Sequence, residues 1–109
     1  MLVIAVDFDN TLCKCAYPDI GEPNTPLIEQ LKAIRKQGHK LILWTCREGV
    51  LLWKAIVWCA HQGLLFDAHN ANLPERIEEW GTDPRKIGAD LYLDDRAVTP
   101  EMFLKGLIS

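Results

Sequence analysis

The sequence predicts an α/β fold built on a small parallel sheet of about four strands. Short aliphatic runs recur along the chain, segments of helical periodicity separate them, and polar residues stand where the runs end. The first run, Leu2 to Val6, is continuously apolar, which is typical of a strand buried on both faces of a parallel sheet. Alternation of strands and helices then implies right-handed crossover connections.

The segment 13–24 follows the first strand and carries Pro18, Gly21 and Pro23, which predicts an irregular excursion. Thr25 is the expected N-cap of a first helix, with a proline directly after it and apolar residues at helical spacing. That helix should close at a glycine, position 38. Residues 40–45 (Lys-Leu-Ile-Leu-Trp-Thr) form the expected second buried strand.

A second helix is expected over residues 48–62, and apolar side chains occupy nearly all of its faces. Such a helix is either deeply buried in the core or covered by a partner. We therefore carry two interpretations forward, simple core packing and a homo-oligomer that forms through helix 48–62.

The remaining elements are shorter. A strand is expected over residues 66–69, and Asn72, followed by Leu, Pro and Glu, predicts the N-cap of a helix that ends near Gly81. A last strand covers residues 91–93, and a final helix covers residues 100–107. Together these elements predict a three-layer, Rossmann-like sandwich with a small parallel sheet.

Length and composition set broad limits. A chain of 109 residues is one domain, here 1–109, and it is 49% hydrophobic and 25% charged, as in ordinary globular proteins. A net charge of −3 argues against tight nonspecific binding to nucleic acid. The first apolar run is too short for a signal peptide or a membrane span, so we expect a cytoplasmic protein that does not bind membranes.

The chain has four cysteines, at positions 13, 15, 46 and 59, without the spacing of paired metal-binding knuckles. Reduced thiols are expected in the cytoplasm. A zinc site made of Cys13, Cys15 and a histidine is the less favoured alternative.

Two aspartates, Asp7 and Asp9, come directly after the first strand. In open α/β sheets the carboxyl ends of the strands form the ligand-binding edge. Two converging carboxylates repel each other unless a cation or a shared proton lies between them. The pattern therefore indicates a Mg²⁺ site with one carboxylate left free to react. The alternative is that both residues only cap the next turn.

Other strands also end in polar residues. Thr45 ends the second strand, Asp94 and Asp95 follow the last strand, and Lys86 lies shortly before it. Because parallel strands end at one edge of the sheet, these groups should meet Asp7 there. Several carboxylates in one small region are costly without a metal ion.

With these motifs in view, the chain resembles the haloacid dehalogenase superfamily, in particular its short members without a cap domain. The motifs that carry the resemblance are Asp7-Phe-Asp-Asn-Thr11, Leu41-Ile-Leu-Trp-Thr45, Lys86 and Leu91-Tyr-Leu-Asp-Asp95, in the order of that family. The resemblance spans nearly the whole chain. It implies a Mg²⁺-dependent phosphomonoesterase that works through an aspartyl-phosphate intermediate.

The resemblance also implies a role for each residue. Asp7 is the expected nucleophile, and Asp9 is the expected general acid and base, whose backbone carbonyl also reaches the metal. Thr45 would bind a phosphoryl oxygen and Lys86 would neutralise charge. The expected metal set and the expected substrate contacts are as follows: Asp7, Asp9, Asp94 and Asp95 for Mg²⁺; Asn10, Thr11 and Arg47 for substrate.

Three points stay open at this stage. Arg85 adjoins Lys86 and is the second choice for the positive charge, and either Asp94 or Asp95 is the direct metal ligand. Asn10 stands where the family most often has glycine, and asparagine tolerates the left-handed backbone of such a turn. Arg47 is as well explained by a salt bridge as by a phosphate contact.

Some polar residues have ordinary explanations. Cys46 lacks a phosphate-cradling loop and is best read as a packed thiol. Asn70 stands where substrate would approach, whereas capping explains Asn72 more simply. His39, His61 and His69 need no function.

The space between Thr11 and the first helix is about a dozen residues, too few for a folded cap, and this favours a phosphatase over a mutase. An open site suits a small phosphorylated substrate, with a phosphorylated nucleic-acid end as the alternative. Two other classes remain as alternatives for the whole chain: a receiver-like domain that accepts a phosphoryl group, and a catalytically silent binding module of the same fold.

Overall fold

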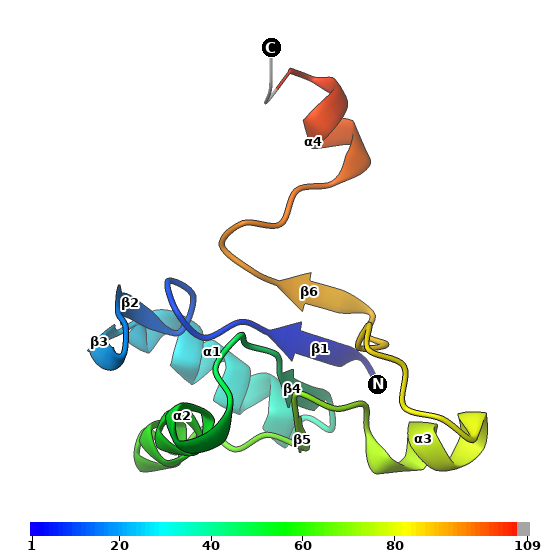
Figure 1. The fold of residues 1–109 in the computed structure, drawn as a ribbon, viewed down its shortest axis with the longest axis horizontal. Coiled ribbons are helices and arrows are strands. Elements are labelled where there is room, and N and C mark those ends of the chain that lie inside the picture. The colour runs from blue at the N-terminus through cyan, green and yellow to red at the C-terminus, as the bar shows by residue number, and fades with distance from the viewer. Residues whose placement is uncertain (107–109) are drawn as a thin grey trace.

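The computed structural model describes residues 1–106 and contains a four-stranded parallel sheet (Figure 1). The strand order is β5 (Ala68–His69), β4 (Lys40–Leu43), β1 (Val3–Val6) and β6 (Leu91–Leu93). The pairs β1–β4, β1–β6 and β4–β5 are all parallel. The α/β class and the four strands predicted from the sequence are confirmed, although β4 ends two residues earlier than expected.

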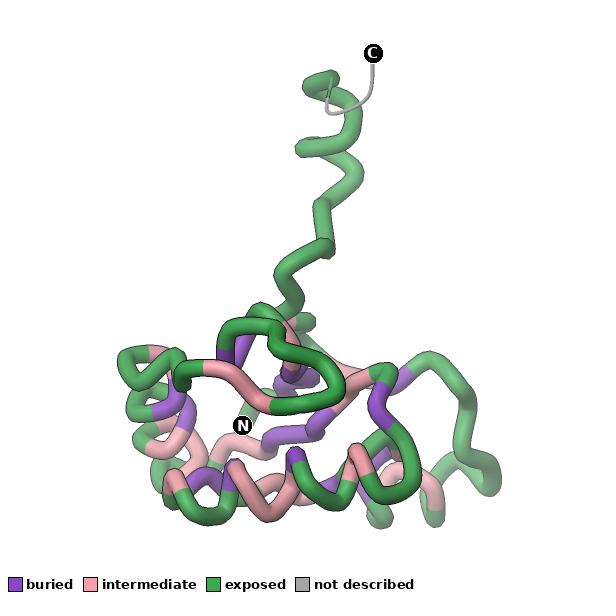
Figure 2. Tube along the Cα trace, turned by 60° about the vertical axis from the view of Figure 1, so that its left-hand side comes forward, coloured by how far each residue is buried: buried purple, intermediate pink, exposed green. Residues whose placement is uncertain are grey.

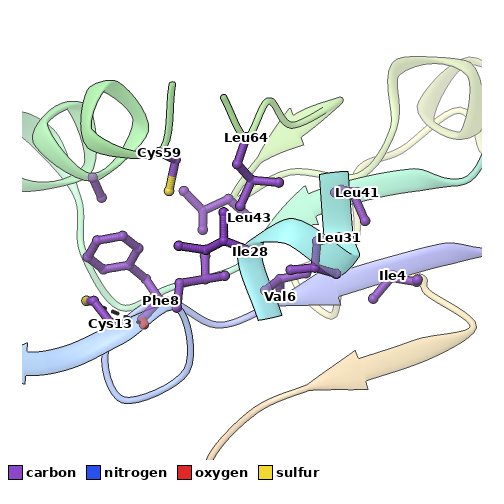
Figure 3. Packing of buried hydrophobic residues seen from close by; sticks show 12 residues of the cluster. Ile4, Val6, Phe8, Cys13, Ile28, Leu31, Leu41, Leu43, Cys59 and Leu64 are labelled. Carbon is purple, nitrogen blue, oxygen red and sulfur yellow. Dashed lines mark hydrogen bonds between the residues drawn. The ribbon is translucent and has the colours of Figure 1, made fainter. Parts of the chain in front are cut away.

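Two separate apolar clusters lie on the two faces of this sheet. The larger cluster lies between the sheet and helices α1 (Thr25–Lys36) and α2 (Gly49–His61), and Figure 3 shows Val6, Ile28 and Leu43 packing within it. The smaller cluster lies on the other face, where Val3, Ala5 and Ile42 meet Leu73, directly before helix α3 (Pro74–Trp80). Alternate residues of β1 therefore serve opposite faces, and the molecule has three layers.

The segment between β1 and α1 is more regular than the sequence predicted. It forms an antiparallel hairpin of β2 (Cys13–Ala16) and β3 (Asp19–Pro23), with a register shift between Cys13 and Cys15. The prediction of an irregular excursion was wrong because mostly exposed hairpin strands lack a continuous apolar pattern. No cap domain is present in residues 1–106, as expected.

Two predicted helix caps shift by one residue. Asn24, not Thr25, caps α1: its side chain accepts a hydrogen bond from the Leu27 amide, and Thr25 already belongs to the helix. The N-cap of α3 is Leu73 rather than Asn72, and it makes no side-chain cap.

The side chain of Asn72 does not cap a helix but bonds a distant loop. Its side chain is buried and donates to Asp83 Oδ1 at 2.8 Å and to the Pro84 carbonyl at 3.0 Å, and its Oδ1 accepts from the Gly88 amide at 2.6 Å. These bonds tie the segment just before α3 to the loop that leads into β6. The prediction failed because these partners lie 11 to 16 positions along the chain, beyond the reach of a local capping rule.

The chain leaves the sheet after β6 and ends in a short helix, α4 (Pro100–Leu104). Figures 1 and 2 show this helix standing off from the rest of the described chain, and its residues are exposed. The end of the helix predicted over 100–107 lies outside the described residues. Among residues 1–106, no helix has the length and hydropathy needed to cross a bilayer.

Candidate active site

Three carboxylates meet at the carboxyl edge of the sheet. Asp7 follows β1, whereas Asp94 and Asp95 follow the neighbouring strand β6. The amide of Asp7 donates to the Leu93 carbonyl at 2.9 Å, which fixes the two strand ends side by side. One oxygen atom from each carboxylate lies within 4.8 Å of the other two. The expected meeting of acids from opposite ends of the sequence is therefore present in the structure.

The environment of Asp7 disfavours its negative charge. Burial, followed by the charge of Asp94, raises the pKa of Asp7 from its ordinary 3.8 to about 6. The Asp7 carboxylate accepts one side-chain hydrogen bond, from Thr11 Oγ1 at 3.2 Å to Oδ2, which acts in the opposite direction. A cation between these carboxylates would relieve the same repulsion.

The chemistry of this donor set fits a hard divalent cation. All three side chains offer carboxylate oxygens, which Mg²⁺ prefers, and the spacing lets the three oxygens face one ion. Asp94 and Asp95 are exposed, so waters can complete an octahedral shell. The residues present therefore fit Mg²⁺, and either aspartate after β6 can be a direct ligand.

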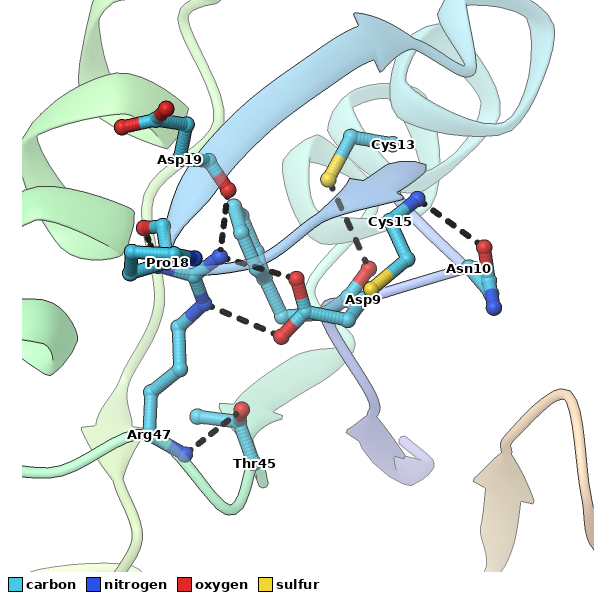
Figure 4. Close-up of polar contacts among 9 residues, drawn as sticks. Asp9, Asn10, Cys13, Cys15, Pro18, Asp19, Thr45 and Arg47 are labelled. Carbon is cyan, nitrogen blue, oxygen red and sulfur yellow. Dashed lines mark hydrogen bonds and ion pairs between the residues drawn. The ribbon is translucent and has the colours of Figure 1, made fainter.

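Asp9 is held apart from this cluster by Arg47. The Arg47 Nε and Nη2 atoms each donate to one Asp9 carboxylate oxygen at 2.9 Å, a bidentate pair (Figure 4). Arg47 is only 1% exposed. The Asp9 carboxylate is not among the three that converge, so the expectation that its side chain belongs to the metal set is not supported by this geometry.

Arg47 also fastens the hairpin over Asp9. Its Nη1 and Nη2 donate to the backbone carbonyls of Pro18 and Asp19 at 3.1 and 2.8 Å. Its guanidinium stacks between the rings of Phe8 and Tyr17, about 5 Å from each centroid. Of the two explanations the sequence left open, the salt bridge is the one observed, and it is buried rather than superficial.

The turn after β1 depends on Asn10. Its φ of 64° lies in the left-handed region, which explains why asparagine replaces glycine here without breaking the turn. Its Oδ1 accepts from the Cys15 amide at 2.9 Å. Asn10 therefore shapes the loop, and it also lines the hollow above the acids.

Thr45 lies at the end of the segment that follows β4. Its Oγ1 accepts from the Arg47 amide at 3.1 Å, which leaves the hydroxyl proton free for an oxygen of a ligand. Asn70 holds this loop from the other side, because its Oδ1 accepts from the Thr45 amide and its Nδ2 donates to the Arg47 carbonyl. Asn70 is thus a positioning residue for Thr45.

Lys86 is the predicted residue that the structure does not bring into the cluster. Its Nζ lies 5.7 Å from the centroid of the Tyr92 ring, a cation–π distance. It is not among the residues that line the acidic hollow. Arg85, the other choice, is exposed as well.

The hollow over the acids has a volume of about 320 Å³ and opens to solvent. It is lined by residues from three of the four predicted strand ends, by one residue of the hairpin and by one basic residue that sequence reasoning missed: Asp7, Asp9, Asn10, Cys15, Thr45, Cys46, Asp94, Asp95 and Arg96. The Arg96 Nε lies 4.0 Å from Asp95 Oδ2. Its position directly after the two aspartates was the available signal.

The cysteines do not form a second centre. All four are free thiols, with Cys13 and Cys59 buried and Cys15 and Cys46 exposed. Burial and the nearby charge of Asp9 raise the pKa of Cys13 to about 11, which opposes the thiolate that zinc requires.

Comparison with known proteins gives one close structural match. A conserved protein of Bacteroides thetaiotaomicron is 48% identical and superposes with a TM-score of 0.80, over 89% of this chain and 78% of that one. The sequence matches no protein-family model and no curated protein. At this identity the match supports the α/β architecture described above, and the description of that protein names no activity.

Proposed function

We propose that this chain, which belongs to the same family as that conserved Bacteroides thetaiotaomicron protein, is a Mg²⁺-dependent phosphomonoesterase of the haloacid dehalogenase type. The convergence of Asp7, Asp94 and Asp95 within 4.8 Å carries this proposal. Carboxylates at the edge of a parallel sheet, beside a threonine hydroxyl and an open hollow, fit the motifs by which the sequence resembles that superfamily. Phosphoryl transfer needs little more than such positioning and charge neutralisation.

In the first step, a carboxylate oxygen of Asp7 attacks phosphorus and the bond to the leaving oxygen breaks, which gives an aspartyl-phosphate. The leaving oxygen takes a proton from Asp9. In the second step water attacks phosphorus, Asp9 takes a proton from that water, and the bond between Asp7 and phosphorus breaks to release phosphate. Asp94 and Asp95 would hold the ion with Asp7, and bound Mg²⁺ would supply neutralising charge at the phosphoryl oxygens.

The contacts of Asp9 set a condition on this scheme. Both of its oxygens accept from Arg47, so the observed arrangement is that of an ionised carboxylate. Asp9 donates a proton only after it is protonated and at least one of these bonds is given up. Arg47 therefore positions Asp9 for the base step, and at least one of its hydrogen bonds to Asp9 must break for the acid step.

Two further groups complete the proposed site. Thr45 donates its free hydroxyl proton to a phosphoryl oxygen. Lys86 is the proposed cation: its ammonium lies over the Tyr92 ring in this structure and would have to move to reach a phosphoryl oxygen. Arg96 and Asn10 line the hollow where the rest of the substrate would sit. Thr11, also expected to contact substrate, is buried and donates to Asp7 instead.

A small phosphate monoester is the proposed substrate, because the hollow of about 320 Å³ is small and the chain carries a net charge of −3. A phosphorylated nucleic-acid end is the alternative that an open site allows. A cytoplasmic location is part of the proposal, supported by four free thiols.

The test is release of phosphate from para-nitrophenyl phosphate with and without Mg²⁺. We expect Mg²⁺-dependent turnover, and a loss of at least about 1,000-fold in Asp7→Asn, which removes the nucleophile but keeps the shape. Sugar phosphates, nucleotides and 5′- or 3′-phosphorylated oligonucleotides then form the substrate panel.

The other outcomes separate the alternatives. Stable phosphorylation of Asp7 by acetyl phosphate without turnover would favour a receiver-like domain. Mg²⁺ binding without hydrolysis of any ester in the panel would favour a silent binding module. Either result would contradict the proposed activity.

A further inference from the structure

An apolar groove runs beside the edge strand β6, on the face of the sheet covered by α1. It has a volume of about 320 Å³, and apolar side chains of α1, β6 and the neighbouring strand β1 form most of its walls: Ile4, Leu27, Leu31, Ile34, Leu91 and Leu93. Leu91 is 52% exposed, which is unusual for a leucine in a parallel strand. The sheet has no strand beyond β6 in residues 1–106 to shelter this side.

The helix that follows β6, α4, carries apolar side chains that are exposed to solvent. Met102, Phe103 and Leu104 are all exposed, Leu104 by 85%, and Val98 in the link before the helix is exposed as well. In Figure 2 the whole of α4 extends away from the body of the molecule.

The sequence nevertheless specifies a helix at this position. Thr99 Oγ1 accepts from the Met102 amide at 3.2 Å, and Pro100 occupies the first turn, so the N-terminus is well capped. A helix of five residues is not stable in water without tertiary packing. Such a helix therefore needs a surface to pack on.

We propose that α4 docks into the groove between α1 and β6 of a second copy of this chain, in a reciprocal exchange that forms a twofold dimer. Each copy supplies one apolar helix and one apolar groove, so the two contacts are identical and the assembly closes. The exposed Leu91 of β6 and the exposed apolar residues of α4 are then buried together.

The path of the chain favours docking of α4 in the groove of a second copy over docking in the groove of its own chain. In this structure α4 does not occupy the groove of its own chain, because it stands off from the sheet after β6 (Figures 1 and 2). In the structure Asp94 Oδ1 accepts from the Arg96 amide at 2.9 Å, and the chain continues away from the sheet (Figure 1). This geometry presents α4 to a neighbouring molecule.

The experiment is the solution mass of the full chain, measured by light scattering over a wide range of concentrations. We expect a dimer for the wild type and a monomer for Leu104→Asp on the helix side and for Leu91→Lys on the groove side. Val50→Asp is the matched control, because Val50 is an exposed apolar residue of α2 and lies on neither proposed surface. It should stay dimeric.

Mixing the two interface variants sharpens the test. The mixture contains one intact helix and one intact groove on different chains, so we expect dimers to reappear at high concentration. A wild type that is monomeric at all concentrations would overturn the proposal. So would a Val50→Asp monomer beside a dimeric Leu104→Asp, because the interface would then lie on α2.

A disulfide crosslink distinguishes docking of α4 on a second copy from docking on its own chain. Gln30→Cys combined with Leu104→Cys places one thiol at the groove and one on α4. Mild oxidation should link two chains, visible on a non-reducing gel, whereas a purely intrachain disulfide would mean that α4 covers its own groove. Each single variant is a control, because Cys15 and Cys46 are already exposed.

Discussion

Arg47 and Asp9, 38 positions apart in the sequence, form a bidentate ion pair with both distances at 2.9 Å. The guanidinium is almost wholly buried, and its remaining donors bond the hairpin carbonyls. The pair therefore links three segments of the chain: the loop after β1, the loop after β4 and the β2–β3 hairpin.

Replacing Arg47 with alanine should lower the free energy of unfolding by about 3 kcal/mol, because it leaves a carboxylate and two carbonyls without their donor. Urea denaturation measures this loss. Arg47→Lys keeps the charge but not the planar fork, so it should recover only part of the stability. An alanine variant as stable as the wild type would mean that water replaces the guanidinium at no cost.

Asp7→Asn should stabilise the metal-free protein at pH 8 and have little effect at pH 4. The pKa of Asp7 is raised to about 6 in the folded state, so ionisation opposes folding. This unfavourable contribution is absent below pH 3.8, grows as the pH rises to about 6 and is constant above it. Thermal unfolding of both proteins across this range, without divalent ions, measures the difference. A constant difference at all pH values would contradict the shift.

Mg²⁺ should raise the melting temperature of the wild type, since a ligand at 100 times its Kd adds about 2.7 kcal/mol to stability. Asp95→Asn should weaken Mg²⁺ binding by at least about tenfold, or about 1.4 kcal/mol. Glu79→Gln removes one exposed carboxylate from α3, away from the acidic cluster, and should leave Mg²⁺ binding unchanged. Calorimetric titration checks both variants, and equal losses in the two would point to a nonspecific charge effect.

Asn72→Ala should cost about 2 to 3 kcal/mol, because it removes the bonds of a buried side chain to Asp83, Pro84 and Gly88. Denaturation at neutral pH tests the size of the effect. Asn70→Ala is the informative comparison: its bonds position Thr45, so it should reduce catalysis more than stability.

The parts of this molecule that the sequence predicts well follow from strong local patterns. The apolar runs at β1 and β4 and the acids after β1 and β6 fix the parallel sheet and place Asp7 beside Asp94 and Asp95. A parallel sheet brings strand ends together whatever the loops do, so this cluster needed no knowledge of side-chain contacts.

The parts that it predicts poorly depend on pairings between distant segments. No local sequence pattern predicts that Arg47 reaches Asp9, or that Asn72 bonds the loop before β6 instead of capping α3. The hairpin escaped detection because its strands are mostly exposed and carry no buried face. Lys86 was expected at the acids from its place in the sequence, but its ammonium lies over Tyr92.

The placement of β6 at the border of the sheet has one more consequence. Two of the three clustered carboxylates follow a three-residue strand that pairs with β1 alone, whereas the main hydrophobic core is built on β1, β4, α1 and α2. Brief fraying of the C-terminal part would separate the clustered carboxylates while the core stays intact. Amide exchange at Asp7, whose hydrogen bond to Leu93 bridges the two strands, would then run faster than exchange along β4. The proposed phosphatase activity would then be lost well before global unfolding.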